Sequence, residues 1–147
     1  MTSPHYYRSN TGFEAKEIIF MWRLSFSLGN TLKYICRAGL KTEGQDDDLR
    51  KAIDYAREEI SHIERISSGQ IIFPTEPYSI VWGSDQDAFT DCDPYEIARA
   101  WNFTDDLRYV LQYILEASCC RRCGDYEGSL KALRALEKIL VLRREKP

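Results

Sequence analysis

EIIFMWRLSFSLGNTLKYICRA, residues 17–38, aligns without a gap with EIARAWNFTDDLRYVLQYILEA, residues 96–117. Amphipathic helices match leucines by coincidence, but Trp22 and Trp101 pair in the same unbroken register, which indicates a duplication. With a small insertion, the following DLRKAIDYAREEI corresponds to SLKALRALEKILV. The sequence therefore predicts an all-α chain: a helical bundle made of two tandem, diverged helical repeats.

Capping residues and glycines delimit the helices expected in the first repeat. Thr11 is a candidate cap for a first helix, and Ser27 for a second that stops at Gly39. The acidic residues 46–48 suit the start of a third helix, which Gly69 ends. Apolar residues recur at helical spacing through all three segments.

A connector with a different composition separates the repeats. Residues 69–94 contain IIF and YSIVW around PTEP, which predicts a short β-hairpin-like unit, followed by the acidic GSDQDAFTDCDP. Its aspartates do not match a calcium-binding loop, so a solvated linker is favoured, with Asp93 capping the next helix. The expected domains are 1–68, the connector, and a second repeat over 95–147, structural in role.

Composition excludes several protein classes. A chain of 147 residues with 44% apolar side chains can bury a core without metal or disulfide staples. A net charge of -3 disfavours general nucleic-acid binding, and the apolar runs are too short to cross a membrane. The five cysteines form no disulfide pattern, which favours a cytoplasmic location. For Cys119, Cys120 and Cys123, packed thiols, a redox switch and a metal site remain open.

Asn30, Lys33 and Arg37 fall on one side of the second predicted helix, and Lys41 extends the strip. Its cations repel one another, and a bound anion, best a phosphate, relieves that repulsion. Gly29 removes a side chain beside the strip, which lets a ligand approach the backbone. A salt-bridged surface is the alternative, with Asp46, Asp47, Asp48 or Asp54 as partners. The residues alone leave both interpretations open.

The second repeat lacks this polar strip. Tyr109, Gln112 and Glu116 replace Asn30, Lys33 and Arg37, while the apolar positions are kept. On a functional interpretation the first repeat binds a ligand and the second is its packing partner. On a structural interpretation both faces are exposed and have drifted. Tyr113 matches Tyr34 in a repeat without the cations, which favours a packing role for Tyr34 over base stacking.

Three motifs in the first half, HYY, GNTLKYICRAGLK and DLRKAIDY, resemble those of the phage nucleotide-kinase-like family, the small SaV-like phage proteins formerly listed as a domain of unknown function. The matched positions run from His5 to Tyr55. Members of that family carry the module once, whereas this chain continues into a second repeat.

The resemblance implies a phage nucleotide-binding protein that transfers phosphate between nucleoside phosphates. It implies phosphate contacts from the cations, contacts to sugar or base from polar and aromatic residues, and proton transfer or acceptor orientation from a histidine or carboxylate. The nucleotide-binding candidates are Tyr6, Gly29, Asn30, Lys33, Tyr34, Arg37, Lys41, Lys51 and Asp54, and the catalytic candidates are His5 and Asp48. A terminal residue without a role and a helix cap are the alternatives for His5 and Asp48.

No metal ligands are expected, and magnesium enters only as a companion of the nucleotide. The expected partner is a nucleotide or another phosphorylated small molecule, together with further copies of the chain in a homo-oligomer. The location implied is the host-cell cytoplasm. Two alternative functions remain: a non-catalytic binder that sequesters a nucleotide or nucleotide-derived signal, and a helical module that inhibits a host protein.

Overall fold

The computed structural model describes residues 14–41, 43–69, 94–120 and 126–145. Every regular element in these ranges is a helix, so the all-α prediction is confirmed. The helices are α1 (Ala15–Met21), α2 (Phe26–Leu40), α3 (Gln45–Ser67), α4 (Pro94–Ala100), α5 (Asp105–Cys120) and α6 (Glu127–Glu145). The predicted hairpin-like connector, the Asp93 cap and the Thr11 cap lie outside the described residues.

A tight turn links α1 to α2. Arg23 has a positive φ of 49°, which reverses the chain after Trp22. Ser25 then caps α2: its Oγ accepts from the Leu28 backbone N–H at 3.1 Å and donates to the Glu59 carboxylate at 2.9 Å. Ser27, the predicted cap, is buried inside α2, so that prediction is wrong by two residues. The Ser25 cap also ties α2 to a fully buried carboxylate on α3.

Gly39 lies inside the last turn of α2 and does not end it, since Lys41 is the C-cap. A Cβ atom at Gly39 would stand 2.6 Å from the backbone oxygen of Trp101. Glycine is therefore needed here because the turn after α4 packs directly on the α2 backbone.

The long helix α3 follows the sequence prediction closely. Gly44, with φ of 74°, precedes it, and Asp46, Asp47 and Asp48 occupy its first turn. Carboxylates at this end interact favourably with the helix dipole. The helix ends at Ser67, and Gly69 follows with φ of 80°.

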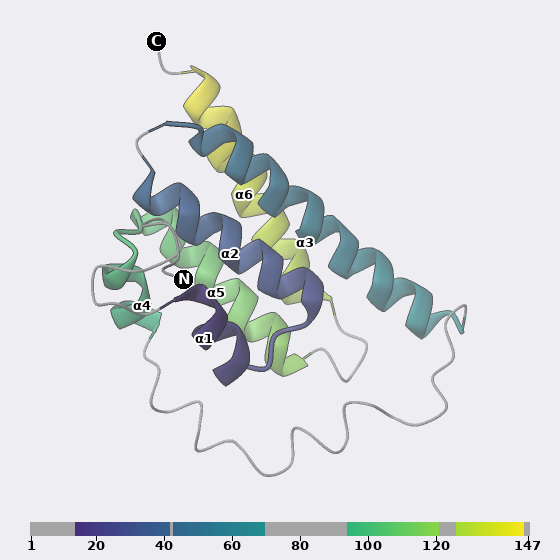
Figure 1. Ribbon diagram of the computed structural model, residues 1–147. Helices are drawn as coiled ribbons and strands as arrows, with labels where there is room; N and C mark the ends of the chain where they lie inside the picture. Colours follow the sequence, from purple (N-terminus) through teal and green to yellow (C-terminus); the bar gives the residue numbers. More distant parts are fainter. Residues whose placement is uncertain (1–13, 42, 70–93, 121–125, 146–147) are drawn as a thin grey trace.

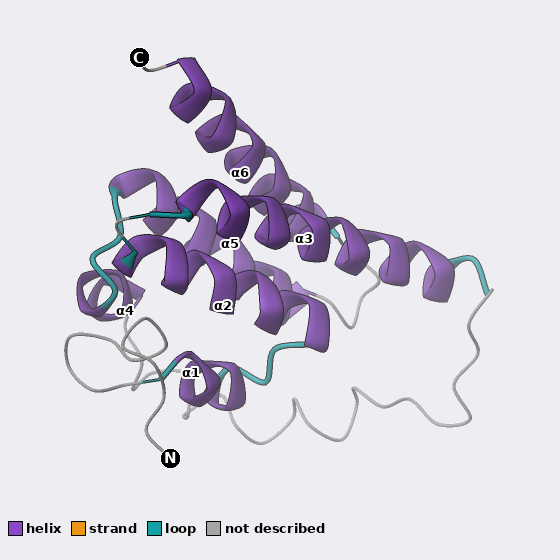
Figure 2. Cartoon of the chain, turned by 45° about the horizontal axis from the view of Figure 1, so that its top comes forward, coloured by secondary structure: helices purple, strands orange, loops and turns teal. Residues whose placement is uncertain are grey.

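The helices pack as two hairpins that face each other (Figure 1). Helix α2 lies along α3 and α5 lies along α6; α3 then packs on α6, and α2 touches α5. The short helices α1 and α4 pack against α2 and α5, respectively. Figure 2 shows α1 beneath α2, apart from the α3–α6 layer.

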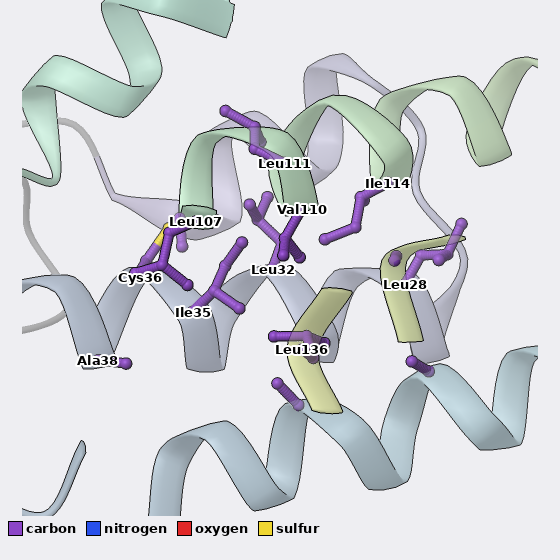
Figure 3. Close-up of a cluster of buried hydrophobic side chains, with 14 of the residues drawn as sticks. Leu28, Leu32, Ile35, Cys36, Ala38, Leu107, Val110, Leu111, Ile114 and Leu136 are labelled. Carbon is purple, nitrogen blue, oxygen red and sulfur yellow. The ribbon is translucent and has the colours of Figure 1, made fainter. Parts of the chain in front are cut away.

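The core lies where the hairpins meet. Figure 3 shows side chains of α2 and α5 pointing toward one another, with Leu136 of α6 beside them. Leu32, Ile35, Leu111 and Ile114 are completely buried. Among them lies the Cys36 thiol, and its burial raises the pKa of that group well above its ordinary range, because desolvation disfavours the thiolate.

Polar contacts also join the first half of the chain to the second half. The Ser118 hydroxyl donates to the Trp22 backbone oxygen at 3.0 Å inside the core. At the surface, Arg143 near the end of α6 donates to Asp46 at the start of α3 at 2.6 Å. Among the described residues, no helix is long and apolar enough to cross a membrane.

Candidate functional site

Helix α2 carries the predicted polar strip on the side away from the core. Asn30, Lys33 and Arg37 are each partly buried, and Lys41 follows at the helix C-cap. The apolar stripe on the other side packs into the hairpin interface. The structure thus places these residues along one face of α2, as their spacing predicts.

Three cations surround the ring of Tyr34. Lys33 Nζ lies 4.6 Å from the ring centroid, Lys51 Nζ of α3 lies 5.4 Å from it, and the Arg37 guanidinium carbon lies at 5.5 Å. An aromatic face attracts cations at such distances. Positively charged groups from both α2 and α3 therefore lie together around the Tyr34 ring.

The same ring begins a series of three aromatic side chains. Tyr34 and Tyr55 stack with centroids 5.9 Å apart and an interplanar angle of 12°. Phe26 meets Tyr55 edge to face at 6.0 Å, and 73% of Phe26 is exposed. The packing role predicted for Tyr34 agrees with its stacking on Tyr55, whereas Phe26 offers its ring to solvent. We call Phe26, Lys33, Tyr34, Lys51 and Tyr55 the Tyr34 corner.

Asp48 is paired with two members of the strip. Its carboxylate is buried, with Lys41 Nζ at 3.1 Å from Oδ2 and Arg37 Nε at 3.6 Å from Oδ1. These ion pairs match the salt-bridged interpretation for Arg37 and Lys41, and the catalytic role of Asp48 stays a prediction.

Lys33 and Lys51 are in a different situation. Within the described ranges, no carboxylate lies at ion-pair distance from either ammonium group. The other aspartates named as alternative partners do not reach them: Asp46 bonds Arg143, Asp47 bonds Arg50, and Asp54 is exposed. These two lysines keep the unbalanced positive charge of the Tyr34 corner.

Gly29 and Asn30 have structural roles in α2. Gly29 is buried, and a Cβ atom there would stand 3.1 Å from Ile19 Cγ2 of α1. Its missing side chain makes room for α1 and not for a ligand, which corrects the sequence interpretation. Asn30 donates from its side-chain nitrogen to the Phe26 backbone oxygen at 2.8 Å, so that donor is used within α2.

Several predicted residues lie outside the described ranges. His5 and Tyr6 precede residue 14, and Cys123 falls between α5 and α6. Within the described residues, no cluster of three or more histidine, cysteine or carboxylate side chains is placed to hold a metal ion.

Sequence analysis missed the parts played by Tyr55 and Phe26. Tyr55 closes the DLRKAIDY motif, and Lys51 precedes it by one helical turn, which places both on the same face of α3. Phe26 precedes Asn30 by the same spacing on α2. The spacing of these residues was therefore visible in the sequence, but spacing alone does not reveal which faces of α2 and α3 meet.

A family model described as a protein of unknown function, DUF3310, matches residues 1–57. No curated protein and no solved structure matches the chain. The match includes the three motifs on which the resemblance to a nucleotide-kinase-like family was based, and its description names no nucleotide kinase. That family assignment is therefore wrong, and the phage origin inferred from it is unsupported.

Proposed function

We propose that the chain binds a nucleotide or another phosphorylated small molecule at the Tyr34 corner, with Lys33 and Lys51 as the phosphate-binding pair. The observation that carries this proposal is the position of these lysines on different helices, 4.6 and 5.4 Å from the same ring centroid. These two distances place the ammonium groups no more than about 10 Å apart, within about one Debye length, so that they repel each other. A phosphate between them relieves the repulsion and accepts charge-assisted hydrogen bonds.

The exposed ring of Phe26 supports a nucleotide among phosphorylated ligands. Phe26 continues the series that starts at Tyr34, through the Tyr55 ring. Bases stack on exposed aromatic side chains, at about 1–3 kcal/mol per base. A ligand with a flat ring and a phosphate group therefore meets both kinds of contact offered by this surface.

We propose the non-catalytic form of this function. Binding needs only the two lysines and the exposed ring, whereas the reaction would also use Asp48, whose carboxylate is ion-paired with Arg37 and Lys41. Phosphoryl transfer between nucleoside phosphates stays a prediction, as do the homo-oligomer and the cytoplasmic location.

We also propose that the chain consists of two tandem repeats related by an offset of 79 residues. Helices α1 and α4 start at Ala15 and Pro94, and α2 and α5 start at Phe26 and Asp105, which gives that offset twice. Arg23 and Asn102 have positive φ angles of 49° and 57° at the same relative position. A positive φ is uncommon outside glycine, so its occurrence at the same relative position in both halves is a specific feature to share.

The caps and side-chain contacts support the same proposal. The Thr104 hydroxyl accepts from the Leu107 N–H at 3.4 Å, as the Ser25 hydroxyl does from Leu28. Lys131 lies 6.0 Å from the centroid of Tyr113, as Lys51 lies 5.4 Å from that of Tyr34. These lysine contacts relate α3 to α6 by an offset of 80 residues. This offset is one residue shorter than the one in the alignment of DLRKAIDYAREEI with SLKALRALEKILV.

Titration calorimetry with inorganic phosphate and a panel of nucleoside mono- and triphosphates tests the binding function. We expect Lys33→Ala and Lys51→Ala each to weaken the tightest ligand by about 1–3 kcal/mol, the range for hydrogen bonds to charged groups. Lys131→Ala is the matched control, because Lys131 occupies the equivalent place in the second half and lies 3.7 Å from Glu127. It should leave the affinity unchanged.

Equal affinities in the wild type and both corner variants would remove the phosphate site from the Tyr34 corner. Chromatography of mixed nucleotides after incubation with the protein separates the two forms of the function. Unchanged nucleotides together with measurable binding support a non-catalytic binder, while interconversion supports phosphoryl transfer.

A further inference from the structure

A cavity of about 160 Å³ lies on the second hairpin, between α5 and α6. Tyr109 and Tyr113 of α5 form one wall, and Ala135 and Lys138 of α6 form the other. The cavity shares Asp106, Ile139 and Leu142 with a larger hollow of about 360 Å³, which reaches the ends of α2 and α3. The two hollows therefore lie next to each other at these three side chains.

The first hairpin explains why space remains beside Tyr113. With the repeat offsets proposed above, Tyr113 corresponds to Tyr34 and Ala135 corresponds to Tyr55. In the first hairpin the Tyr55 ring fills the equivalent place and stacks on Tyr34. In the second hairpin alanine leaves that place empty, while the tyrosine wall is kept. The cavity is thus a site from which one aromatic ring is missing.

We propose that this cavity binds a small molecule built on one planar aromatic ring, which stacks on Tyr113 as Tyr55 stacks on Tyr34. The size is suitable, because an apolar protein cavity of about 150 Å³ holds benzene. Tyr113 is partly buried and Tyr109 is 48% exposed, so a bound ring is covered on one side and reachable from solvent. Offset stacking contributes about 0.5–1.5 kcal/mol beyond the area that it buries.

The polar side chains at the rim of the cavity indicate the charge and the substituent of the ligand ring. Lys138 and Asp106 bring one charge of each sign, so the cavity favours a ring without net charge. The larger hollow adds the uncharged hydrogen-bonding side chains of Gln45, Asn102 and Thr104, together with Arg143, whose charge is paired with Asp46. We therefore expect the ligand ring to carry a neutral polar substituent that points toward the larger hollow.

Nuclear magnetic resonance titration of the full-length protein with p-cresol tests this site. We expect saturable shifts in the Tyr113 and Ala135 signals, with cross-relaxation between the p-cresol ring protons and the Tyr113 ring. The comparison ligand is 4-methylcyclohexanol, which has the same substituents on a ring that is not flat. It should bind about 2- to 10-fold more weakly, the factor that corresponds to loss of stacking.

Ala135→Tyr should weaken p-cresol binding at least 10-fold, because the new ring takes the place of the ligand. Val141→Tyr is the control, since Val141 lies on the same helix, is 51% exposed and lines neither hollow. It should bind p-cresol as the wild type does. Ala135→Leu provides the same test if the tyrosine variant does not fold, as judged by circular dichroism.

The proposal is overturned if p-cresol shows no saturable binding, if 4-methylcyclohexanol binds equally well, or if the filled variants retain wild-type affinity. Cross-relaxation to residues elsewhere, without contact to Tyr113, would also overturn it. The phosphate site on the first hairpin is not involved, so Lys33→Ala should leave p-cresol binding unchanged. The two proposals thus fail or succeed separately.

Discussion

The surroundings of Tyr34 and Tyr113 differ although the helices that carry the two rings are alike. Tyr34 is stacked on Tyr55 and has three cations within 5.5 Å of its ring centroid. Tyr113 has an open cavity beside it and a single lysine at 6.0 Å. The buried positions that build each hairpin are mostly apolar in both halves, while many exposed positions differ. The surface beside the ring therefore differs between the two halves, while the mostly apolar core pattern is kept.

Removal of the Asp48 carboxylate should give the largest effect on stability, because it breaks the buried ion pairs of the first hairpin. Asp48→Ala removes the buried carboxylate that Arg37 and Lys41 share, and loss of one member of a buried pair costs about 3–5 kcal/mol. The two cations are 14% and 22% exposed, so water offsets part of this cost. We expect the free energy of unfolding, measured in urea, to fall by about 2–4 kcal/mol.

Asp47→Ala is the matched control for this variant. Asp47 is the neighbouring residue, and its carboxylate, 76% exposed, pairs with Arg50 on the helix surface. Such a pair contributes about 0.2–1 kcal/mol. Similar losses in the two variants would mean that the Asp48 cluster does not stabilise the first hairpin.

Substitution of two glycines of α2 should change the free energy of unfolding by less. Gly39 tests a contact between the two halves of the chain, and Gly29 tests a contact within the first half. A Cβ atom at Gly39 meets the Trp101 backbone oxygen at 2.6 Å, and we expect Gly39→Ala to destabilise the protein by about 1–3 kcal/mol. At Gly29 the nearest atom is a side-chain methyl group of Ile19 at 3.1 Å, which can move.

For Gly29→Ala, this small strain opposes a gain in helix propensity of up to about 1 kcal/mol. The net change in the free energy of unfolding should be close to zero. Equal destabilisation by both substitutions would contradict the tight contact between α2 and the turn after α4.

The last expected effect appears only at high pH and concerns the buried thiol of Cys36, which the sequence alignment pairs with Leu115. Burial raises the pKa of Cys36 in the folded state, so the unfolded chain loses the proton first as pH rises above about 8.5. Stability linked to Cys36 is complete below that pH and is lost as pH rises toward the raised pKa, at up to about 1.4 kcal/mol per pH unit.

Urea unfolding of the reduced wild type and Cys36→Val between pH 7 and pH 10 measures this term. The difference between the two proteins should be constant below pH 8 and should then shift in favour of the variant. Parallel pH profiles would show that the thiol is not the source of the slope.

Much of the fold was predictable because helical periodicity and end signals act locally. The aspartates of the first turn and Gly69 after the last turn mark α3 in the sequence and in the structure alike. The assignment of Ser27 as a cap failed because Ser25, two residues earlier, carries the same hydroxyl chemistry. Its choice depends on Glu59, a partner 34 residues away. A local pattern contains no information on such a partner.

The site was predictable in part for the same reason. The spacing of Lys33 and Arg37 placed them on one face of α2, and the structure agrees. Their partners depend on how α3 is rotated against α2, which buried Asp48 beneath Arg37 and Lys41 and brought Lys51 to Tyr34. The functions of the two glycines likewise depend on which element packs over each one.

The arrangement in two hairpins has a consequence for the order of folding. The contacts between α2 and α3, and those between α5 and α6, join segments that are near each other along the chain. Such local contacts form quickly, whereas the pairing of α3 with α6 must close a long loop. We therefore expect the docking of the preformed hairpins to limit the folding rate, with the α2–α5 interface completed in that step.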